Sequence, residues 1–200
     1  MGLLLYDSAV SGNCYKVRLL LAQLALPYER VELDVVDRSD RAQVLGGLNP
    51  ALRVPTVVFG DGRSLGESNA ILWYLADGTE LVPAAAFERA QVLQWQFFEQ
   101  YDHEPNVAVA RFWLTKRSGE VDPDRLAGWH AGGYRALDAL ERHLAGRAFL
   151  VDGRYTIADV SLYAYTHVAH EGGFDLGPYP AVRAWLERVA AQPGHVPIDA

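Results

Sequence analysis

The spacing of apolar residues over the first third of the chain changes back and forth between that of strands and that of helices. A short apolar run at 3–6 has the length of a buried strand. Between residues 17 and 24, the apolar side chains fall three and four positions apart, which predicts an amphipathic helix. Pro27 ends this helix, because the residue before a proline disfavours the helical conformation. We therefore expect a strand followed by a helix at the start of the chain.

The same alternation continues to residue 78. The further elements expected there are strands at 28–33, 54–59 and 64–65, a short helix within 37–47, and a helix at 67–76. The strands at 54–59 and 64–65 are joined by Asp61-Gly62, a hairpin turn sequence. A strand-helix-strand unit followed by a hairpin and a helix predicts a mixed four-stranded sheet with helices packed on it.

After Gly78 the pattern becomes helical, and no convincing strand follows. Residues 79–86 have the character of a linker. The sequence therefore predicts two domains, a small α/β domain at 1–78 and an all-helical domain at 87–200.

The predicted helical domain carries three local features. Pro105 lies within a long aromatic helix and predicts a kink. Gly128, Gly132 and Gly133 lie inside the next helix, where they indicate either a weak helix or close packing against its backbone. Thr156 and Asp159 have the spacing of a capping box, in which the two residues exchange hydrogen bonds at the start of a helix.

Composition and charge exclude several classes of protein. The formal net charge is −7, and the longest basic cluster is Lys116-Arg117, so the basic stripe of a nucleic-acid-binding protein is absent. No run approaches the roughly 18 apolar residues of a membrane span, and the first residues do not read as a secretory signal. Cys14 is the one cysteine, which excludes an intramolecular disulfide and fits a reducing compartment. We expect no membrane or nucleic-acid partner, and a cytoplasmic location.

Candidate chemistry begins in the loop before the first helix, where Ser11 and Asn13 lie. A helix N-terminus has unpaired N–H groups and a partial positive charge, and it favours an anion such as a thiolate. A hydroxyl or an amide at that place can donate a hydrogen bond to sulfur and lower its pKa. Taken alone, either residue is better explained as a simple helix cap.

Two later segments have a similar pair of explanations. If the bond between Val54 and Pro55 is cis, the Val54 backbone is presented at the edge of the sheet, where an extended peptide could pair with it. The alternative is an ordinary trans proline that opens a strand. Glu67 and Ser68 open a helix, so they could bind an ammonium and a carboxylate of one ligand, or could only cap the helix.

These segments together resemble the cytosolic glutathione transferase superfamily along nearly the whole chain. The resemblance is carried by SGNCYKVR at 11–18, NPALRVPTVVF at 49–59, GESNAIL at 66–72, the linker to a helical domain, and TIADVSLYAY at 156–165. The pattern is closest to bacterial members with serine or threonine in the first loop, similar to those with disulfide-bond reductase activity. It implies a thioredoxin-like N-terminal domain, an all-helical C-terminal domain and a homodimer.

The resemblance also implies roles in binding glutathione. Ser11 takes the position that faces the glutathione sulfur, and Asn13 matches the asparagine in the loop of the bacterial reductase-type members. Val54 pairs its backbone with the cysteinyl part of glutathione, before a cis Pro55. The remaining implied contacts are Glu67 and Ser68 with the γ-glutamyl end and Arg53 with the glycyl carboxylate.

Two residues near the first loop depart from simple expectations. Tyr6 ends the first strand, as a catalytic tyrosine does in some classes of the family, but the loop here is one residue longer. We therefore interpret Tyr6 as a packing residue, with contact to sulfur as the alternative. Cys14 falls on the first turn of the helix rather than at the sulfur-facing position, so we interpret it as a buried structural residue.

A second substrate is expected in a pocket between the two domains, lined by the long aromatic helix. Tyr101, Asn106 and Trp113 are the candidates for that pocket, although aromatic residues at helical spacing more often belong to the core. The histidines lack partners at metal-ligand spacing, so we expect no metal.

The activity implied is that of a glutathione transferase, in which the glutathione thiolate attacks an electrophilic small molecule. One alternative is a glutathione-dependent disulfide-bond reductase that uses the same site. The other is a binding protein of the same fold without catalysis.

Overall fold

The computed structural model describes residues 2–117, 119 and 121–200 and divides the chain into two compact units. The first unit comprises Met1–Thr79 together with Pro193–Ala200, and the second comprises Glu80–Gln192. The sequence predicted a helical domain that runs to residue 200. The last eight residues instead pack with the first unit.

The first unit is built on a four-stranded sheet in the order β2-β1-β3-β4. Its strands are β1 (Leu3–Asp7), β2 (Glu29–Glu32), β3 (Thr56–Phe59) and β4 (Ser64–Gly66). β1 runs parallel to β2 and antiparallel to β3, and β3 runs antiparallel to β4. The mixed four-stranded sheet predicted from the sequence is confirmed.

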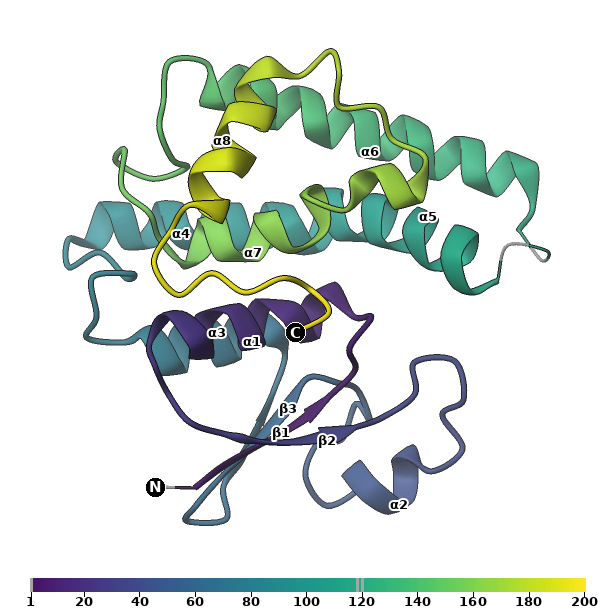
Figure 1. Cartoon of the computed structure of the whole chain (residues 1–200), viewed down its shortest axis with the longest axis vertical. Helices are drawn as coiled ribbons and strands as arrows, with labels where there is room; N and C mark the ends of the chain where they lie inside the picture. The colour runs from purple at the N-terminus through teal and green to yellow at the C-terminus, as the bar shows by residue number, and fades with distance from the viewer. Residues whose placement is uncertain (1, 118, 120) are drawn as a thin grey trace. The chain divides into compact units, whose positions relative to one another are not determined.

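Three helices cover this sheet: α1 (Gly12–Gln23), α2 (Arg41–Leu45) and α3 (Ser68–Ala76). α1 and α3 lie side by side on one face, and α2 lies on the other side of the strands (Figure 1).

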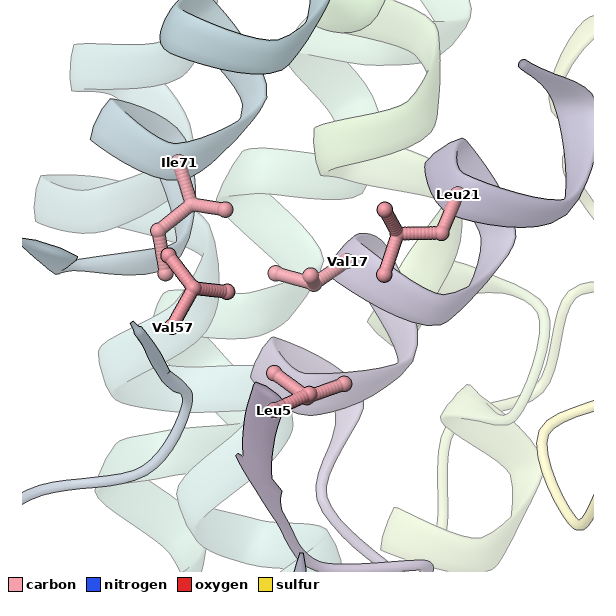
Figure 2. Close-up of a cluster of buried hydrophobic side chains, with 5 residues drawn as sticks. All are labelled: Leu5, Val17, Leu21, Val57 and Ile71. Carbon is pink, nitrogen blue, oxygen red and sulfur yellow. The ribbon is translucent and has the colours of Figure 1, made fainter. Parts of the chain in front are cut away.

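The core of the first unit lies between the sheet and its two long helices. Leu5 and Val57 are paired across β1 and β3, so their side chains point to the same face. Val17 and Leu21 of α1 and Ile71 of α3 complete the cluster, and all five side chains are fully buried (Figure 2). Each such side chain contributes about 1.5–3 kcal/mol through burial, which fixes α1 and α3 against the sheet.

The C-terminal segment 193–200 packs on the first unit through its backbone. The carbonyl oxygens of Val196, Ile198 and Ala200 accept hydrogen bonds from Tyr15, Arg18 and Arg30, respectively. Gly194 has a φ of +72°, and a Cβ at that position would lie 2.8 Å from the Cα of Gln23. The segment therefore approaches the end of α1 too closely for any side chain at this position.

All the named elements of the second unit are helices. They are α4 (Ala86–Phe98), the π-helix η1 (Glu99–His103), α5 (Glu104–Lys116), α6 (Pro123–Leu144), α7 (Ile157–Thr166), the 3-10 helix η3 (Ala169–Gly172) and α8 (Pro180–Ala190). Within the described part of the chain, no helix has both the length and the apolar character needed to cross a membrane.

The sequence predicted a kink at Pro105, and the structure has a π-helix, η1, shortly before this proline, while the kink itself stays a prediction. Proline has no N–H and cannot donate to the carbonyl one turn earlier, which is that of Tyr101. The neighbouring Glu104 N–H donates to the carbonyl of Glu99, five residues back, as in a π-helix. The long aromatic helix is thereby divided into α4 and α5.

Close packing explains two of the three glycines inside α6, Gly132 and Gly133, whereas a Cβ on Gly128 would have nothing within 4 Å. A Cβ on Gly132 would lie 2.1 Å from the side chain of Asn106, and a Cβ on Gly133 would lie 2.4 Å from the ring of Phe174. The close-packing explanation is therefore correct for Gly132 and Gly133, because neighbouring side chains occupy the space that a methyl group would need, and it is wrong for Gly128.

The predicted capping box at the start of α7 is confirmed. The Thr156 hydroxyl accepts a hydrogen bond from the backbone of the first helical turn, and Asp159 accepts one from the Thr156 N–H at 2.9 Å. Asp159 also accepts bonds from the Leu150 N–H at 3.1 Å and from the Trp185 indole N–H at 2.9 Å. Burial raises the pKa of Asp159 from 3.8 to about 6, although these donors oppose the shift.

Candidate functional site

The pairing of the strands brings three loop segments to one edge of the sheet. Tyr6 of β1 lies opposite Thr56 of β3, and Thr56 lies opposite Gly66 of β4. The chain leaves the sheet beyond this row at the end of β1, before the start of β3, and at the end of β4. These three segments are the ones that the sequence marked as candidates, and all of them belong to the first unit.

Ser11 caps α1 and retains a hydrogen that can be donated. Its Oγ accepts a hydrogen bond from the Cys14 N–H at 3.3 Å, and its backbone has extended angles. Its own N–H donates to the Ser8 carbonyl at 3.0 Å. Because the Ser11 hydroxyl is the acceptor in the cap, its O–H can still donate to a ligand. Capping the helix and contacting a sulfur are therefore compatible roles for this serine.

Cys14 and Tyr6 lie beside this loop. The Cys14 side chain is fully buried, as expected from the sequence. Burial, followed by the nearby charge of Asp7, raises the pKa of the Cys14 thiol well above its usual range, which disfavours a reactive thiolate. Tyr6 is partly exposed within β1, and its backbone pairs with β2 and β3.

Asn13, Lys16 and Ser68 form a cluster of hydrogen bonds between the first turns of α1 and α3. The Lys16 ammonium donates to Asn13 Oδ1 at 2.8 Å and to Ser68 Oγ at 3.4 Å. The Ser68 hydroxyl donates to Asn13 Oδ1 at 3.2 Å. Lys16 is fully buried and was missed by sequence reasoning, which considered only the residues before it.

The Ser68 side chain faces inward, so its backbone is better placed than its hydroxyl for a ligand. The side chain is 4% exposed, and its one hydroxyl hydrogen is directed to Asn13. Ser68 is the first residue of α3, and the capping residue Glu67 makes no side-chain bond to the helix start. The Glu67 side chain therefore does not cap the first turn of α3, and a helix start of this kind favours an anion.

Glu67 has an unusual backbone conformation at this helix start. Its φ is +62°, and its side chain is exposed. A positive φ in a residue other than glycine costs of order 1 kcal/mol and is concentrated at functional sites. The conformation places an exposed carboxylate directly before the first turn of α3.

The segment before β3 is shaped by Asn49, which sequence reasoning treated only as part of a turn. The Asn49 amide donates to the Arg53 carbonyl at 3.1 Å and to Thr56 Oγ1 at 2.9 Å. The Thr56 hydroxyl donates to the same carbonyl at 2.7 Å. A Cβ on Gly66 would lie 2.6 Å from Asn49 Nδ2, so the glycine leaves room for the amide.

This network surrounds a cis bond between Val54 and Pro55, as the resemblance implied. Among the described residues, Val54 makes no backbone hydrogen bond to another backbone group. Val54 is partly exposed and the Arg53 side chain is exposed. The Val54 backbone can therefore pair with an extended ligand in the manner of a strand.

A buried ion pair between Arg18 and Asp7 holds the backbone that leads into the Ser11 loop. The Arg18 Nη1 donates to both carboxylate oxygens of Asp7, at 2.7 and 2.8 Å, and both side chains are buried. The Arg18 guanidinium also donates to the carbonyls of Ser8 and Ala9, which lead into the Ser11 loop. A basic residue among the apolar positions of the first helix was the one sign in the sequence of this support.

The three residues predicted for a second-substrate pocket lie on η1 and α5 of the second unit. The Tyr101 side chain is 84% exposed. The Asn106 amide donates to the Asp102 carbonyl at 2.6 Å, and the Trp113 ring stacks on Trp129 at 6.2 Å between centroids. Their contribution to substrate binding stays a prediction. In the described part of the chain, no group of three or more acidic, His or Cys side chains is arranged to hold a metal ion.

Comparison with known proteins identifies the family. Residues 5–81 match the family described as Glutathione S-transferase, N-terminal domain, and residues 131–193 match Glutathione S-transferase, C-terminal domain. Glutathione S-transferase 3 of Zea mays is 31% identical to the chain, covering 94% of this chain and 89% of the maize protein. The chain belongs to the glutathione S-transferase family.

Other members of the glutathione S-transferase family agree with this assignment. A crystal structure of a glutathione S-transferase from Pseudomonas fluorescens has a TM-score of 0.94 and 46% identity, covering 98% of each chain. The disulfide-bond oxidoreductase YfcG of Escherichia coli is 27% identical, covering 92% of this chain and 89% of that protein. The thioredoxin-like and helical domains of a glutathione S-transferase are confirmed, and the relatives named as transferases are enzymes.

Proposed function

We propose that the protein is a glutathione transferase that binds glutathione at the edge of the first unit and activates its thiol for attack on an electrophilic small molecule. The proposal is carried by one observation, the convergence of the Ser11 loop, Val54 and the start of α3 at a single row of the sheet. These three segments supply a thiol contact, a backbone pairing site and an anion site.

Each part of glutathione has a matching group in the proposed site. The Val54 N–H and C=O pair with the cysteinyl residue. The first N–H groups of α3, beginning with that of Ser68, bind the γ-glutamyl carboxylate, and Glu67 binds the adjacent ammonium. Arg53 reaches the glycyl carboxylate. This assignment moves the role of Ser68 from its hydroxyl to its backbone, because the hydroxyl bonds to Asn13.

Activation requires the thiolate to be favoured over the thiol. A thiol with a pKa near 8.5 is mostly protonated at neutral pH, and lowering that pKa by about two units corresponds to roughly 3 kcal/mol. The Ser11 hydroxyl, the Asn13 amide and the positive end of α1 favour the thiolate. The thiol proton passes to water, and the sulfur electron pair forms a bond to the electrophilic carbon as the leaving group departs or the double bond opens.

Disulfide reduction is the second candidate function, and Asn13 favours it. This asparagine matches the loop of the bacterial reductase-type members, and one relative is named a disulfide-bond oxidoreductase. In that reaction the glutathione thiolate attacks one sulfur of the disulfide, and the other sulfur leaves as a thiolate. A second glutathione then attacks the mixed disulfide, which yields oxidised glutathione and the second thiol.

Assembly as a homodimer in the cytoplasm is part of the proposal. Phe87, Phe97 and Tyr101 expose 69–84% of their side chains along α4 and η1, so this surface offers aromatic groups for a second copy. Sedimentation velocity at several protein concentrations measures this directly. A monomer at all concentrations would contradict the dimer without affecting the proposed chemistry.

The proposed function is tested by binding and by a pair of activity assays. Isothermal calorimetry with glutathione is expected to show one site per chain. An aryl halide and a small disulfide are then compared as second substrates, and faster turnover of the aryl halide supports the transferase. Faster turnover of the disulfide supports the reductase, and absence of glutathione binding favours the non-catalytic protein.

A further inference from the structure

We propose that Lys16 is a positioning residue for the thiol chemistry, which holds the Asn13 amide so that its nitrogen faces the glutathione sulfur. The inference rests on the proposed function, because it concerns the same loop. It is drawn from the cluster of Asn13, Lys16 and Ser68, which no sequence argument anticipated.

The cluster is closed by hydrogen bonds on all three sides. Lys16 lies one helical turn after Asn13, so their side chains share a face of α1. The ammonium donates to Asn13 Oδ1 at 2.8 Å and to Ser68 Oγ at 3.4 Å, and Ser68 donates to Asn13 Oδ1 at 3.2 Å. Burying an ammonium is unfavourable unless polar groups surround it. The fully buried Lys16 ammonium therefore depends on acceptors such as Asn13 and Ser68.

The chemistry of the donors fixes which end of the Asn13 amide faces inward. A lysine ammonium has only donors, so the amide atom against it must be the oxygen. Asn13 Oδ1 therefore accepts from both Lys16 and Ser68, and the amide nitrogen lies at the opposite end of the planar group. Rotating the amide by half a turn would place its NH₂ group against the donors of Lys16 and Ser68. That orientation is therefore disfavoured.

This orientation matters to a thiolate. An amide N–H directed at sulfur donates a hydrogen bond and stabilises the anion, whereas an amide oxygen in the same place would repel it. The hydrogen bond from the Lys16 ammonium to Oδ1 also increases the donor strength of the Asn13 N–H, since hydrogen bonds in a chain polarise one another. Lys16 thus acts on sulfur through Asn13 rather than by contact.

The charged and titratable groups around this cluster have their own assignments. On α1, Arg18 pairs with Asp7, and burial keeps the Cys14 thiol protonated. On the start of α3, the Glu67 carboxylate is exposed. Lys16 is therefore the basic side chain of α1 whose described bonds lead to the proposed thiol site.

The test compares Lys16→Met with the wild type by following the thiolate absorbance of bound glutathione against pH. Methionine has a similar length, no charge and suits a buried position. The expected result is at least about a tenfold lower thiolate fraction at pH 7, with glutathione still bound. Lys116→Met is the matched control, because this lysine is exposed at the end of α5, and it is expected to titrate as the wild type.

A double-mutant cycle decides whether Lys16 acts through Asn13. In an Asn13→Ala background, Lys16→Met is expected to change the thiolate fraction by less than about twofold, because the amide is gone. An undiminished effect in that background would overturn the proposal. So would a Lys16→Met protein that binds glutathione and titrates as the wild type.

Two further measurements separate a folding defect of Lys16→Met, or a failure of the proposed function, from a failure of the role proposed for Lys16. If Lys16→Met does not fold, Ser68→Ala and Asn13→Ala are combined instead, and additive effects on the thiolate fraction overturn the cluster as a unit. If wild-type protein fails to bind glutathione or to lower its thiol pKa, the proposed function itself fails. A wild type that does both, beside an unchanged Lys16→Met protein, removes the role of Lys16 alone.

Discussion

The first backbone N–H groups of α7 are hydrogen-bonded differently from those of α1 and α3. The first N–H groups of any helix lack partners within the helix. At α7, Thr156 and Asp159 exchange hydrogen bonds with the backbone, and both side chains are buried. At α1, the partly exposed Ser11 makes a single long cap, and at α3 the exposed Glu67 makes none.

This difference separates a structural helix start from one that can take a ligand. The groups at α7 are already satisfied within the second unit, so an added anion would find no donor. The starts of α1 and α3 are linked by the hydrogen bonds of Ser68 with Lys16 and Asn13, and they follow strands that end at the same row of the sheet. Sequence patterns at the three sites are alike, since each has a small hydroxyl residue near a helix start, and only the surrounding contacts distinguish them.

The largest effect on stability is expected from Asp159→Ala. The change removes the acceptor of three buried N–H donors, those of Leu150, Thr156 and the Trp185 indole. It should lower the free energy of unfolding by about 4 kcal/mol, since each unsatisfied buried donor costs about 1–3 kcal/mol. Urea unfolding measures the loss. Glu187→Ala, at an exposed position on α8, is the control and should change it by less than about 0.5 kcal/mol.

A pH series tests whether Asp159 is shut off from water. The folded protein raises its pKa from 3.8 to about 6, so it binds this proton more tightly than the unfolded chain. The stabilisation from the proton is complete below pH 3.8 and is lost as the pH rises through about 6, at most about 3 kcal/mol in total. The wild type should therefore lose stability relative to Asp159→Asn between about pH 4 and 6, and a constant difference would contradict this.

A methyl group on α6 tests packing in the second unit without touching a helix start. Gly133→Ala would place Cβ against the ring of Phe174, so it should destabilise by about 2 kcal/mol. Gly128→Ala is the matched control, because nothing lies within 4 Å of its Cβ, and it should stabilise by up to about 1 kcal/mol. Unfolding curves of equal midpoint for the two variants would refute the packing explanation of Gly133.

The smallest effect on stability is expected from Ser11→Ala, although its effect on chemistry should be clear. Loss of the 3.3 Å cap to the Cys14 N–H should cost about 1 kcal/mol of unfolding free energy. Turnover at pH 7 should fall by at least about tenfold, because the thiolate loses a donor. Steady-state kinetics with saturating glutathione measure this. A stable variant with unchanged turnover would make Ser11 only a cap.

The parts of the fold that could be predicted from the sequence depend on local chemistry. The capping box needs only Thr156 and Asp159 at the right spacing, and the hairpin needs only Asp61-Gly62 between two strand patterns. The interruption near Pro105 follows from a missing N–H. Each of these signals is contained in a few adjacent residues.

The parts that could not be predicted depend on partners far along the chain. Lys16 reads as an ordinary polar helix position until Ser68, 52 residues later, lies beside it. The segment 193–200 packs through backbone carbonyls, which have no signature in the sequence. Ser68 itself could be placed at the start of a helix, but the inward direction of its hydroxyl follows from Asn13, not from its neighbours.

The central claim is that the starts of α1 and α3 in the first unit bind glutathione and stabilise its thiolate. Its most direct test is a pH titration of the thiolate absorbance of glutathione bound to the wild-type protein, beside free glutathione. The account predicts a midpoint about two pH units below that of free glutathione. A bound thiol that titrates together with the free one would contradict it.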